Sequence, residues 1–157
     1  MHPSSDLSAI ARSIIDANLY LVLGTADAAG QPWVSPVYYA CADYTEFYWV
    51  SSPDARHSRN LAERPYLSLV IFDSRAPINT GQAVYLSAVA ETLTGAGLDR
   101  GLDVYSRSSL AHGGRAWTAD DVGATARLRL YRALASEHWI LDPDPDRPGD
   151  ARVRVTV

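Results

Sequence analysis

The chain has 157 residues, 47% of them hydrophobic, and a formal net charge of −4. This size and hydrophobic content suit one compact domain, so we predict a single domain over residues 1–157. An acidic chain lacks the excess of Lys and Arg that neutralises nucleic-acid phosphates, so we expect no nucleic-acid partner.

Cysteine and histidine are too sparse for a metal or redox motif. Cys41 is the only cysteine, which excludes a disulfide framework and a CxxC pair and makes a reducing cytoplasm the simplest setting. The histidines are not paired at ligand spacing, so we expect no metal site. The apolar run LYLVL is far too short for a membrane span or a signal core, and we expect no membrane association.

The first predicted element is a helix from Ser4 or Ser5 to Asn18. Either serine can cap its N-terminus. Four apolar residues fall on roughly one side at helical spacing: Leu7, Ile10, Ile14 and Ile15.

Six runs with the β-branched and aromatic composition of strands follow. They are LYLVLGTAD, PWVSPVYYAC, EFYWVSS, YLSLVIFD, QAVYLSAVAETL and RLRLYRALASEHWIL. Short polar turns separate the first three, which predicts an antiparallel meander. Helices are predicted over residues 98–111 and in TADDVGA, where Thr118 and Asp121 form an acidic variant of the capping box. The tail DPDPDRPGDARVRV is rich in proline and aspartate and predicts an extension that passes from ordered to loose.

This pattern determines the predicted fold class. Six strands with little helix to cover a flat sheet would leave exposed edges, and closure into a barrel removes edges. We therefore predict a mainly β protein, a small antiparallel barrel with short flanking helices.

The segment SSPDARHSRNLAERP, after the third strand, concentrates basic residues in an acidic chain. Ser52 is a good helix N-cap, Pro53 suits the first helical position, and Pro65 ends the segment. Basic side chains in a first helical turn oppose the helix dipole, a choice that helps if an anion such as phosphate binds there. The alternative is a solvated helix face whose arginines pair with acids such as Glu63. The basic residues are Arg56, His57, Arg59 and Arg64.

Other side chains suit a flat, polar-edged ligand. The Gln82 amide can both donate and accept hydrogen bonds, as the edge of a flavin pyrimidine ring requires. Tyr48, Trp49 and Trp139 can wall a flat ring, although aromatic residues of this kind are more often simply core.

The order of these features resembles the FMN-binding split barrels of the pyridoxine 5′-phosphate oxidase type. The resemblance covers roughly residues 18–95 and 127–141 and rests on four pieces: GQPWVSPVYYA, EFYWVSSPDARHSRNLAERPYLSLVIFD, GQAVYLSAVAETL and YRALASEHWIL. It implies a six-stranded split β-barrel. It also implies that the chain is an FMN-dependent oxidoreductase acting on a small-molecule substrate or electron acceptor.

The resemblance assigns cofactor-binding roles to residues of the strands and the basic segment. Arg56 and His57 match the basic pair that grips the FMN phosphate. Val50, Ser51 and Ser52 match the strand end whose backbone faces the flavin ring.

Four more residues complete the implied cofactor site. Trp33 and Ser35 match the strand that runs beside the cofactor, and Gln82 matches a glutamine on the pyrimidine side. Trp139 matches an aromatic residue that is typically contributed across a dimer interface. The resemblance therefore implies a homodimer with two FMN sites between subunits.

This sequence departs from the family pattern at two places that concern substrate binding. Pyridoxine phosphate oxidase uses an Arg-x-His motif near its C-terminus, which this chain lacks. It also uses a Tyr and Arg pair on the linking helix, where Tyr105 and Arg107 are more closely spaced. We therefore expect a substrate other than vitamin B6 phosphate, and no side chain stands out as the catalytic acid or base.

Two other functions are compatible with the same barrel. The cofactor could be the deazaflavin F420, whose longer acidic tail would be served by Arg59 and Arg75. Alternatively, the chain could be a non-enzymatic flavin or haem binder. Haem would need an axial ligand, and the candidates are His2, His57, His112 and His138.

Overall fold

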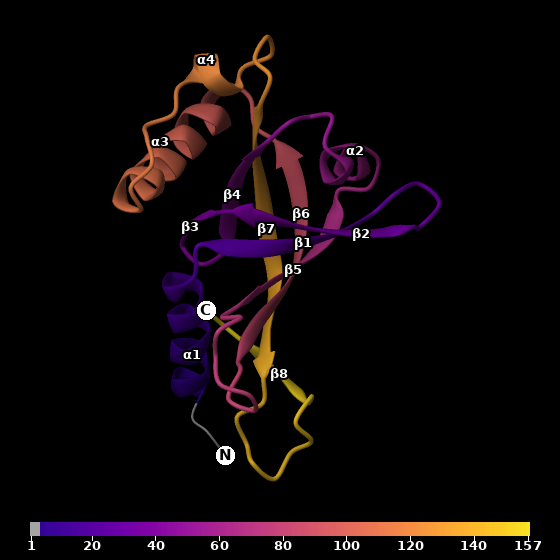
Figure 1. The fold of residues 1–157 in the computed structure, drawn as a ribbon, viewed down its shortest axis with the longest axis vertical. Coiled ribbons are helices and arrows are strands. Elements are labelled where there is room, and N and C mark those ends of the chain that lie inside the picture. The colour runs from indigo at the N-terminus through magenta and orange to yellow at the C-terminus, as the bar shows by residue number, and fades with distance from the viewer. Residues whose placement is uncertain (1–3) are drawn as a thin grey trace.

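One curled antiparallel sheet forms the body of the protein (Figure 1). The computed structural model describes residues 4–157. The strands run in the order β2-β1-β5-β6-β7-β4-β3, and β8 pairs with β7. Their bounds are β1 Tyr20–Ala26, β2 Pro32–Tyr38, β3 Ala40–Ala42, β4 Glu46–Ser51, β5 Tyr66–Phe72, β6 Ala83–Thr92, β7 Arg129–Leu141 and β8 Arg152–Val155. The helices are α1 Ser4–Ala17, α2 Arg56–Glu63, α3 Gly95–Ala111 and α4 Ala119–Val122.

The mainly β split-barrel fold is confirmed: each of the six predicted runs contains a long strand. The helix predicted at the N-terminus and the two predicted before β7 are also present. At α4 the Asp121 carboxylate accepts the Thr118 backbone N–H at 2.8 Å, as the predicted capping box requires. Local sequence patterns therefore identified most of the elements.

The first three predicted runs follow one another as an antiparallel meander: β1 pairs with β2, and β3, which follows β2 after one residue, pairs with β4. The sequence did not predict that β4 also pairs with β7. Nor did it predict that the tail contains a strand, β8 at Arg152–Val155. Its alternating RVRV sequence pairs with the end of β7, a long-range contact that the composition of the preceding residues obscures.

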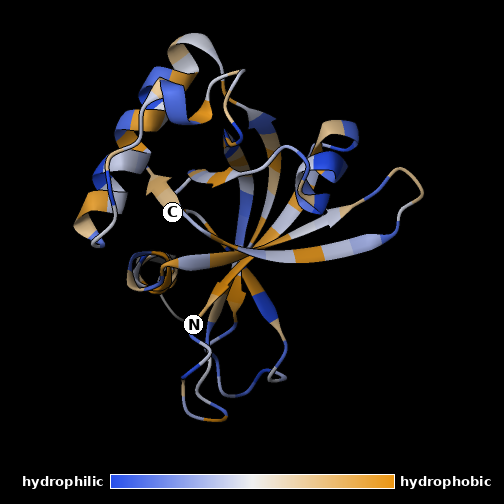
Figure 2. Cartoon of the chain, turned by 45° about the horizontal axis from the view of Figure 1, so that its top comes forward, coloured by the Kyte–Doolittle hydropathy of each residue, from blue (hydrophilic) through white to orange (hydrophobic). Residues whose placement is uncertain are grey.

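The inner face of the curled sheet holds the main core. Along β1, Leu21 and Leu23 are fully buried, whereas Tyr20 on the alternate face is 61% exposed. Phe47 and Trp49 of β4 enter the same core, and α1 covers its lower end with Ala11 and Ile15. The period-two alternation of the strands thus separates a buried face from an outer face. Figure 2 shows the matching mixture of hydrophobic and hydrophilic residues along the strands.

Among residues 4–157, no helix is long and apolar enough to cross a membrane.

A second, smaller core lies between α3 and the outer face of β4 and β7. Tyr48, Leu102, Tyr105 and Leu130 are buried together there. The Glu46 carboxylate on β4 accepts hydrogen bonds from Arg100 on α3 at 2.6 and 2.9 Å, which ties the helix to the sheet. One end of the outer face is therefore covered by α3.

Gly101 sets how closely α3 approaches the sheet. A Cβ at this position would lie 2.6 Å from a Leu93 methyl group and 3.0 Å from a Leu130 methyl group. We predict that Gly101→Ala lowers the free energy of unfolding by about 1–3 kcal/mol because of this overpacking. Gly97→Ala in the same helix is the control, since its Cβ would meet only a Leu93 methyl group at 3.7 Å. We expect Gly97→Ala to be neutral or to stabilise by up to about 1 kcal/mol. Urea unfolding of both variants tests this, and equal effects would contradict it.

Candidate functional site

The predicted phosphate-binding segment joins the end of β4 to α2. Ser51 ends β4, and a turn over residues 52–55 follows, in which the Ala55 N–H donates to the Ser52 carbonyl at 3.1 Å. The Ser52 hydroxyl accepts the Asp54 N–H at 3.1 Å. The expectation that Ser52 caps the helix and Pro53 opens it is therefore wrong. Ser52 stabilises the turn instead, and the helix begins at Arg56.

The N-terminus of α2 is left without a side-chain cap. Ala55 occupies the N-cap position and offers no side-chain oxygen to the first-turn N–H groups. The positive end of the helix dipole is thus uncompensated by the chain itself. Arg56 adds a full positive charge at this end of the helix, and among the described residues no carboxylate lies within salt-bridge distance of it. An uncapped N-terminus beside an unpaired arginine is a favourable place for an anion.

Trp33 supports Arg56 from the neighbouring hairpin. The guanidinium carbon lies 4.4 Å from the centre of the Trp33 ring, in a cation–π contact. Trp33 and Ser35 lie two residues apart on β2 and therefore point to the same face of the strand. The structure brings these two predicted residues to the α2 side of the sheet.

His57 points inward. Its side chain is buried, and its Nε2 lies 2.9 Å from the Ser51 hydroxyl oxygen. Burial lowers the pKa of His57. A neutral imidazole in this position links α2 to the end of β4, whereas the sequence suggested a protonated partner for phosphate.

The remaining polar residues of α2 fasten the helix to the β1–β2 hairpin. The buried Asn60 amide donates to the Thr25 hydroxyl at 3.0 Å, and that hydroxyl donates to the Trp33 carbonyl at 3.2 Å. Arg64 donates to the Ala28 carbonyl at 2.6 Å, and Arg59 donates to the Asp54 carbonyl. Sequence reasoning missed the Asn60–Thr25 pair, because its partners lie 35 residues apart and neither belongs to a motif.

Val50 lies on a different side of β4 from the residues around Arg56. It packs against the small core beneath α3, as Tyr38 of β2 also does. The backbone of Val50 faces the hydroxyl of buried Tyr105, whose pKa is raised to about 12, mainly by burial. The end of β4 therefore contacts both α2 and α3.

Gln82 and Trp139 lie at the opposite end of the sheet from Arg56. Ser51 pairs with Arg129 at the start of β7, and Trp139 lies ten residues further along that strand. At about 3.3 Å per residue this corresponds to roughly 33 Å along the strand. Within one chain, Gln82 and Trp139 therefore lie far from Arg56 and the predicted residues around it.

The Gln82 amide is already engaged within the chain. Its nitrogen donates to the Leu141 carbonyl at 2.9 Å, and its oxygen accepts the N–H groups of Leu141 at 2.9 Å and Ala83 at 3.0 Å. These hydrogen bonds attach Gln82 to the end of the pairing between β6 and β7. One amide hydrogen remains for a ligand.

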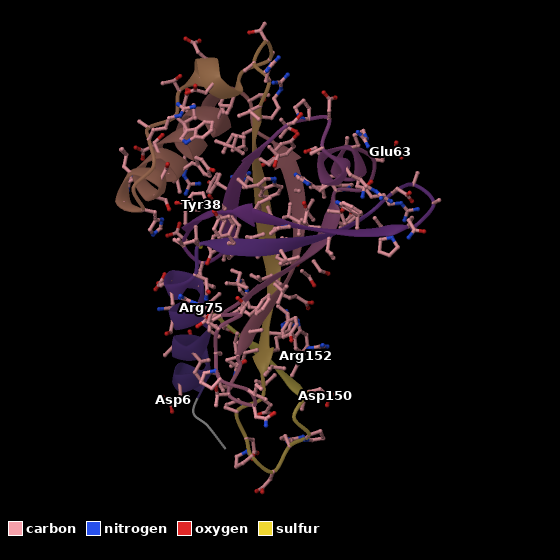
Figure 3. All side chains as sticks on the ribbon, viewed as in Figure 1. Asp6, Tyr38, Glu63, Arg75, Asp150 and Arg152 are labelled. Carbon is pink, nitrogen blue, oxygen red and sulfur yellow. The ribbon has the colours of Figure 1, made fainter. Side chains whose placement is uncertain are left out.

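Trp139 borders an open groove on the outer face of the sheet. The groove has a volume of about 540 Å³, and its walls include Val34, Val70, Tyr85 and Arg152. The Arg152 guanidinium lies over the Tyr85 ring, 4.6 Å from its centre; Figure 3 labels this arginine. The groove is mainly apolar and has one cation at its edge.

The histidines considered for haem ligation differ in accessibility. His2 lies outside the described residues. His57 and His138 are both buried, and the Nε2 of His138 lies 2.7 Å from the Tyr44 carbonyl oxygen. His112 is exposed, and its Nδ1 lies 2.8 Å from the Tyr38 hydroxyl oxygen.

Residues 7–137 match the family model described as pyridoxamine 5′-phosphate oxidase. The chain belongs to this family. A search of the curated proteins found no match.

Solved structures share the family's split-barrel fold at low sequence identity. A haem-binding protein from Mycobacterium smegmatis is 22% identical with a TM-score of 0.72, and the match covers 99% of this chain but only 59% of that one. A FAD-binding protein from Mesorhizobium loti is 22% identical with a TM-score of 0.64, covering 82% and 87% of the two chains. An F420 reductase is 15% identical with a TM-score of 0.60, covering 82% and 94%. These similarities concern the fold.

The buried histidines predict a loss of stability in acid. Burial lowers the pKa of both His57 and His138, so below neutral pH the unfolded chain binds protons that the folded chain excludes. We expect the free energy of unfolding to fall between pH 7 and pH 5. His57→Gln should flatten this dependence, by at most about 1.4 kcal/mol per pH unit. Urea unfolding at several pH values measures the slope, and an identical slope in wild type and variant would contradict the prediction.

Proposed function

We propose that the protein binds FMN between the subunits of a homodimer and acts as a flavin-dependent oxidoreductase. The observation that carries this proposal is the unpaired Arg56 at the uncapped N-terminus of α2, held over Trp33. A terminal phosphate combines the negative charge and the acceptor oxygens that this arrangement lacks. Membership of the family and the FAD-binding neighbour support a flavin.

In this proposal each residue has a distinct task. Arg56 and the first-turn N–H groups of α2 bind the phosphate, and Ser51 and Ser52 present the strand end and turn. His57 acts as a positioning residue, because its contact with Ser51 fixes the helix against the strand. Trp33 and Ser35 flank the cofactor, and Val50 contributes its backbone at the strand end, since its side chain packs beneath α3. When bound, FMN supplies the hydride and electron transfer, and the protein supplies orientation and electrostatics.

The separation between Arg56 and the pair Gln82 and Trp139 supports the proposed homodimer. Gln82 and Trp139 can contribute to a site with Arg56 if they come from a second copy. The outer face that would receive this copy is apolar and open: Val34 is 68% exposed, Tyr66 76% and Val89 42%. Covering such a face is favourable, since exposed apolar patches of this kind mark interaction surfaces.

FMN suits the available charges better than F420 does. The longer acidic tail of F420 would need further unpaired cations near Arg56. Arg59, however, donates to the Asp54 carbonyl, and Arg75 lies 3.9 Å from the Asp73 carboxylate. F420 and haem, suggested by two neighbouring structures, therefore serve as comparison ligands in the binding experiment.

Vitamin B6 phosphate is not the substrate that we propose. Tyr105 is buried with its hydroxyl against the backbone of Val50, and Arg107 is paired with Asp103 on the same helix. The buried Tyr105 is therefore not free to hold a substrate phosphate. The substrate is another small molecule or electron acceptor.

The binding experiment titrates the apo protein with FMN, F420 and haem. Arg56→Ala should weaken FMN by about 1.5–3 kcal/mol, or roughly 10- to 150-fold, because a charge-assisted contact is lost. Arg59→Ala is the matched control from the same helix and should leave the dissociation constant nearly unchanged. An unchanged FMN affinity in Arg56→Ala, or uptake of haem or F420 in preference to FMN, would overturn the assignment.

The dimer is tested by light scattering at micromolar concentration. Val34→Glu places a charge on the open face, so we expect a monomer that binds FMN at least about tenfold more weakly, since desolvating a carboxylate disfavours docking. Ile78→Glu is the control, because Ile78 is 91% exposed in the β5–β6 loop. A wild-type protein that is monomeric, with or without FMN, would remove the argument for a shared site.

A further inference from the structure

A cavity of about 250 Å³ lies between α2 and the adjoining ends of β6 and β7. Figure 1 shows α2 beside this end of β6. Three residues of α2 line the cavity, and because they are three and four positions apart they share one flank of the helix. They are Ser58, Leu61 and Ala62, whereas Arg56 is not part of the lining. The cavity is smaller than the pockets that hold drug-sized ligands, so it suits a small molecule.

The hydroxyl of Ser58 is the feature of this cavity that points to a ligand. Ser58 is 3% exposed, and among residues 4–157 its hydroxyl oxygen has no hydrogen-bond partner. A buried hydroxyl without a partner is costly, and such groups are rare in folded proteins. The other buried polar residues of α2, His57 and Asn60, do have partners in the sheet. A molecule in the cavity can therefore supply the partner that the chain does not.

The opposite wall carries a second hydroxyl, that of Tyr131 on β7. Tyr131 is buried, and its ring stacks on Trp49 with the ring centres 5.5 Å apart, which fixes its position. The side-chain hydrogen bonds found along β7 belong to other residues, so within the described part of the chain the Tyr131 hydroxyl has none. Two hydroxyl groups that line the same cavity are thus available as donors.

Arg129 adds a positive charge to the same wall. It lies two residues before Tyr131 and therefore points to the same face of β7. Its guanidinium donates to three carbonyls of the preceding loop at 2.6–2.8 Å, which leaves two of its five N–H groups. Across residues 4–157, no carboxylate lies within salt-bridge distance of Arg129. Its charge is therefore not compensated by the protein.

These groups define the chemistry of the ligand. A cation and two hydroxyl donors suit the acceptor oxygens of an anion. Glu91 also lines the cavity, but its carboxylate is paired with Arg132, so a second negative charge on the ligand would be repelled rather than bound. The rest of the lining is apolar: Pro53, Leu61, Ala62 and Ala90. This combination favours a monoanion with an apolar body over a phosphate dianion.

We propose that this cavity binds a small monocarboxylate. The hydroxyls of Ser58 and Tyr131 donate to the carboxylate group beside Arg129, and the apolar body of the molecule packs against Leu61 and Ala90. The proposal goes beyond the proposed flavin site and does not depend on it, because none of these residues is assigned to the cofactor. Sequence reasoning placed Ser58 only on the small or apolar side of its helix, since its neighbours in the cavity come from distant strands.

Calorimetric titration of the purified protein with benzoate tests the ligand class. We expect one benzoate per chain, and benzamide, which has a similar shape without the charge, should bind at least about tenfold more weakly. Ser58→Ala should weaken benzoate binding by about tenfold or more, because it removes a charge-assisted hydrogen bond. Ser13→Ala is the matched control, since Ser13 is an exposed serine on α1.

Three outcomes of this titration would overturn the proposal. They are no uptake of benzoate by the wild type, which would leave a cavity that holds water only; equal affinity for benzamide; and an unchanged benzoate affinity in Ser58→Ala. FMN binding is measured separately, so none of these outcomes bears on the proposed function.

Two further variants locate the bound carboxylate. Ala62→Leu extends a side chain at the lining of the cavity and should weaken benzoate binding at least about tenfold; Ala62 is exposed, so the helix can accept the change. Arg56→Ala should leave benzoate affinity unchanged. Unchanged binding in Ala62→Leu, or lost binding in Arg56→Ala, would place the carboxylate elsewhere and contradict the proposed site.

Stability without ligand separates lost binding from misfolding. Because the Ser58 hydroxyl is buried without a partner, Ser58→Ala should be at least as stable as the wild type in urea unfolding. A clear loss of stability would mean that the hydroxyl already has a partner within the chain, and the proposal would then lose its basis.

Discussion

The attachment of α2 to the sheet is the constraint on which the site depends. Two buried side chains of this helix make the attachment: His57 contacts Ser51 at the end of β4, and Asn60 donates to Thr25 in the first hairpin. Because these contacts use the inward side of the helix, Arg56 remains on the outward side at an uncapped N-terminus. An exposed arginine alone would be an unremarkable surface charge. Its value lies in its fixed position over Trp33, beside free N–H groups.

The order of the strands then imposes a second requirement. The ladder from β4 through β7 places Ser51 and Trp139 at opposite ends of one long strand. No rearrangement of side chains can close a distance set by the rise of a strand. In the proposed flavin site, a single chain could therefore supply either the phosphate end or the aromatic end. The open apolar face between these ends is where a second copy would complete both sites at once, since a two-fold arrangement repeats every contact.

Local features of this structure were predictable from the sequence, and long-range ones were not. Strand and helix composition located the elements because it reflects local propensity and burial. The pairing of β4 with β7 was missed because strand order depends on contacts that no short segment encodes. The role of Ser52 was misjudged for a related reason: a serine before Pro-Asp suits a turn as well as a cap. The resemblance singled out Arg56 from the other arginines of the segment, and the sequence could not show that Arg59 and Arg64 donate to backbone carbonyls.

The outer face of the sheet has a covered part and an open part. One half is covered by α3 and the small core that contains Tyr105, and the other half is the open groove beside Trp139. Val50 lies on the covered side, and Trp33 with Arg56 lies at the α2 side. In the proposed site the phosphate end of the cofactor would be defined by α2, whereas α3 covers the neighbouring part of the sheet. The binding end can therefore stay constant while α3 changes, which is how one barrel can serve different acceptors.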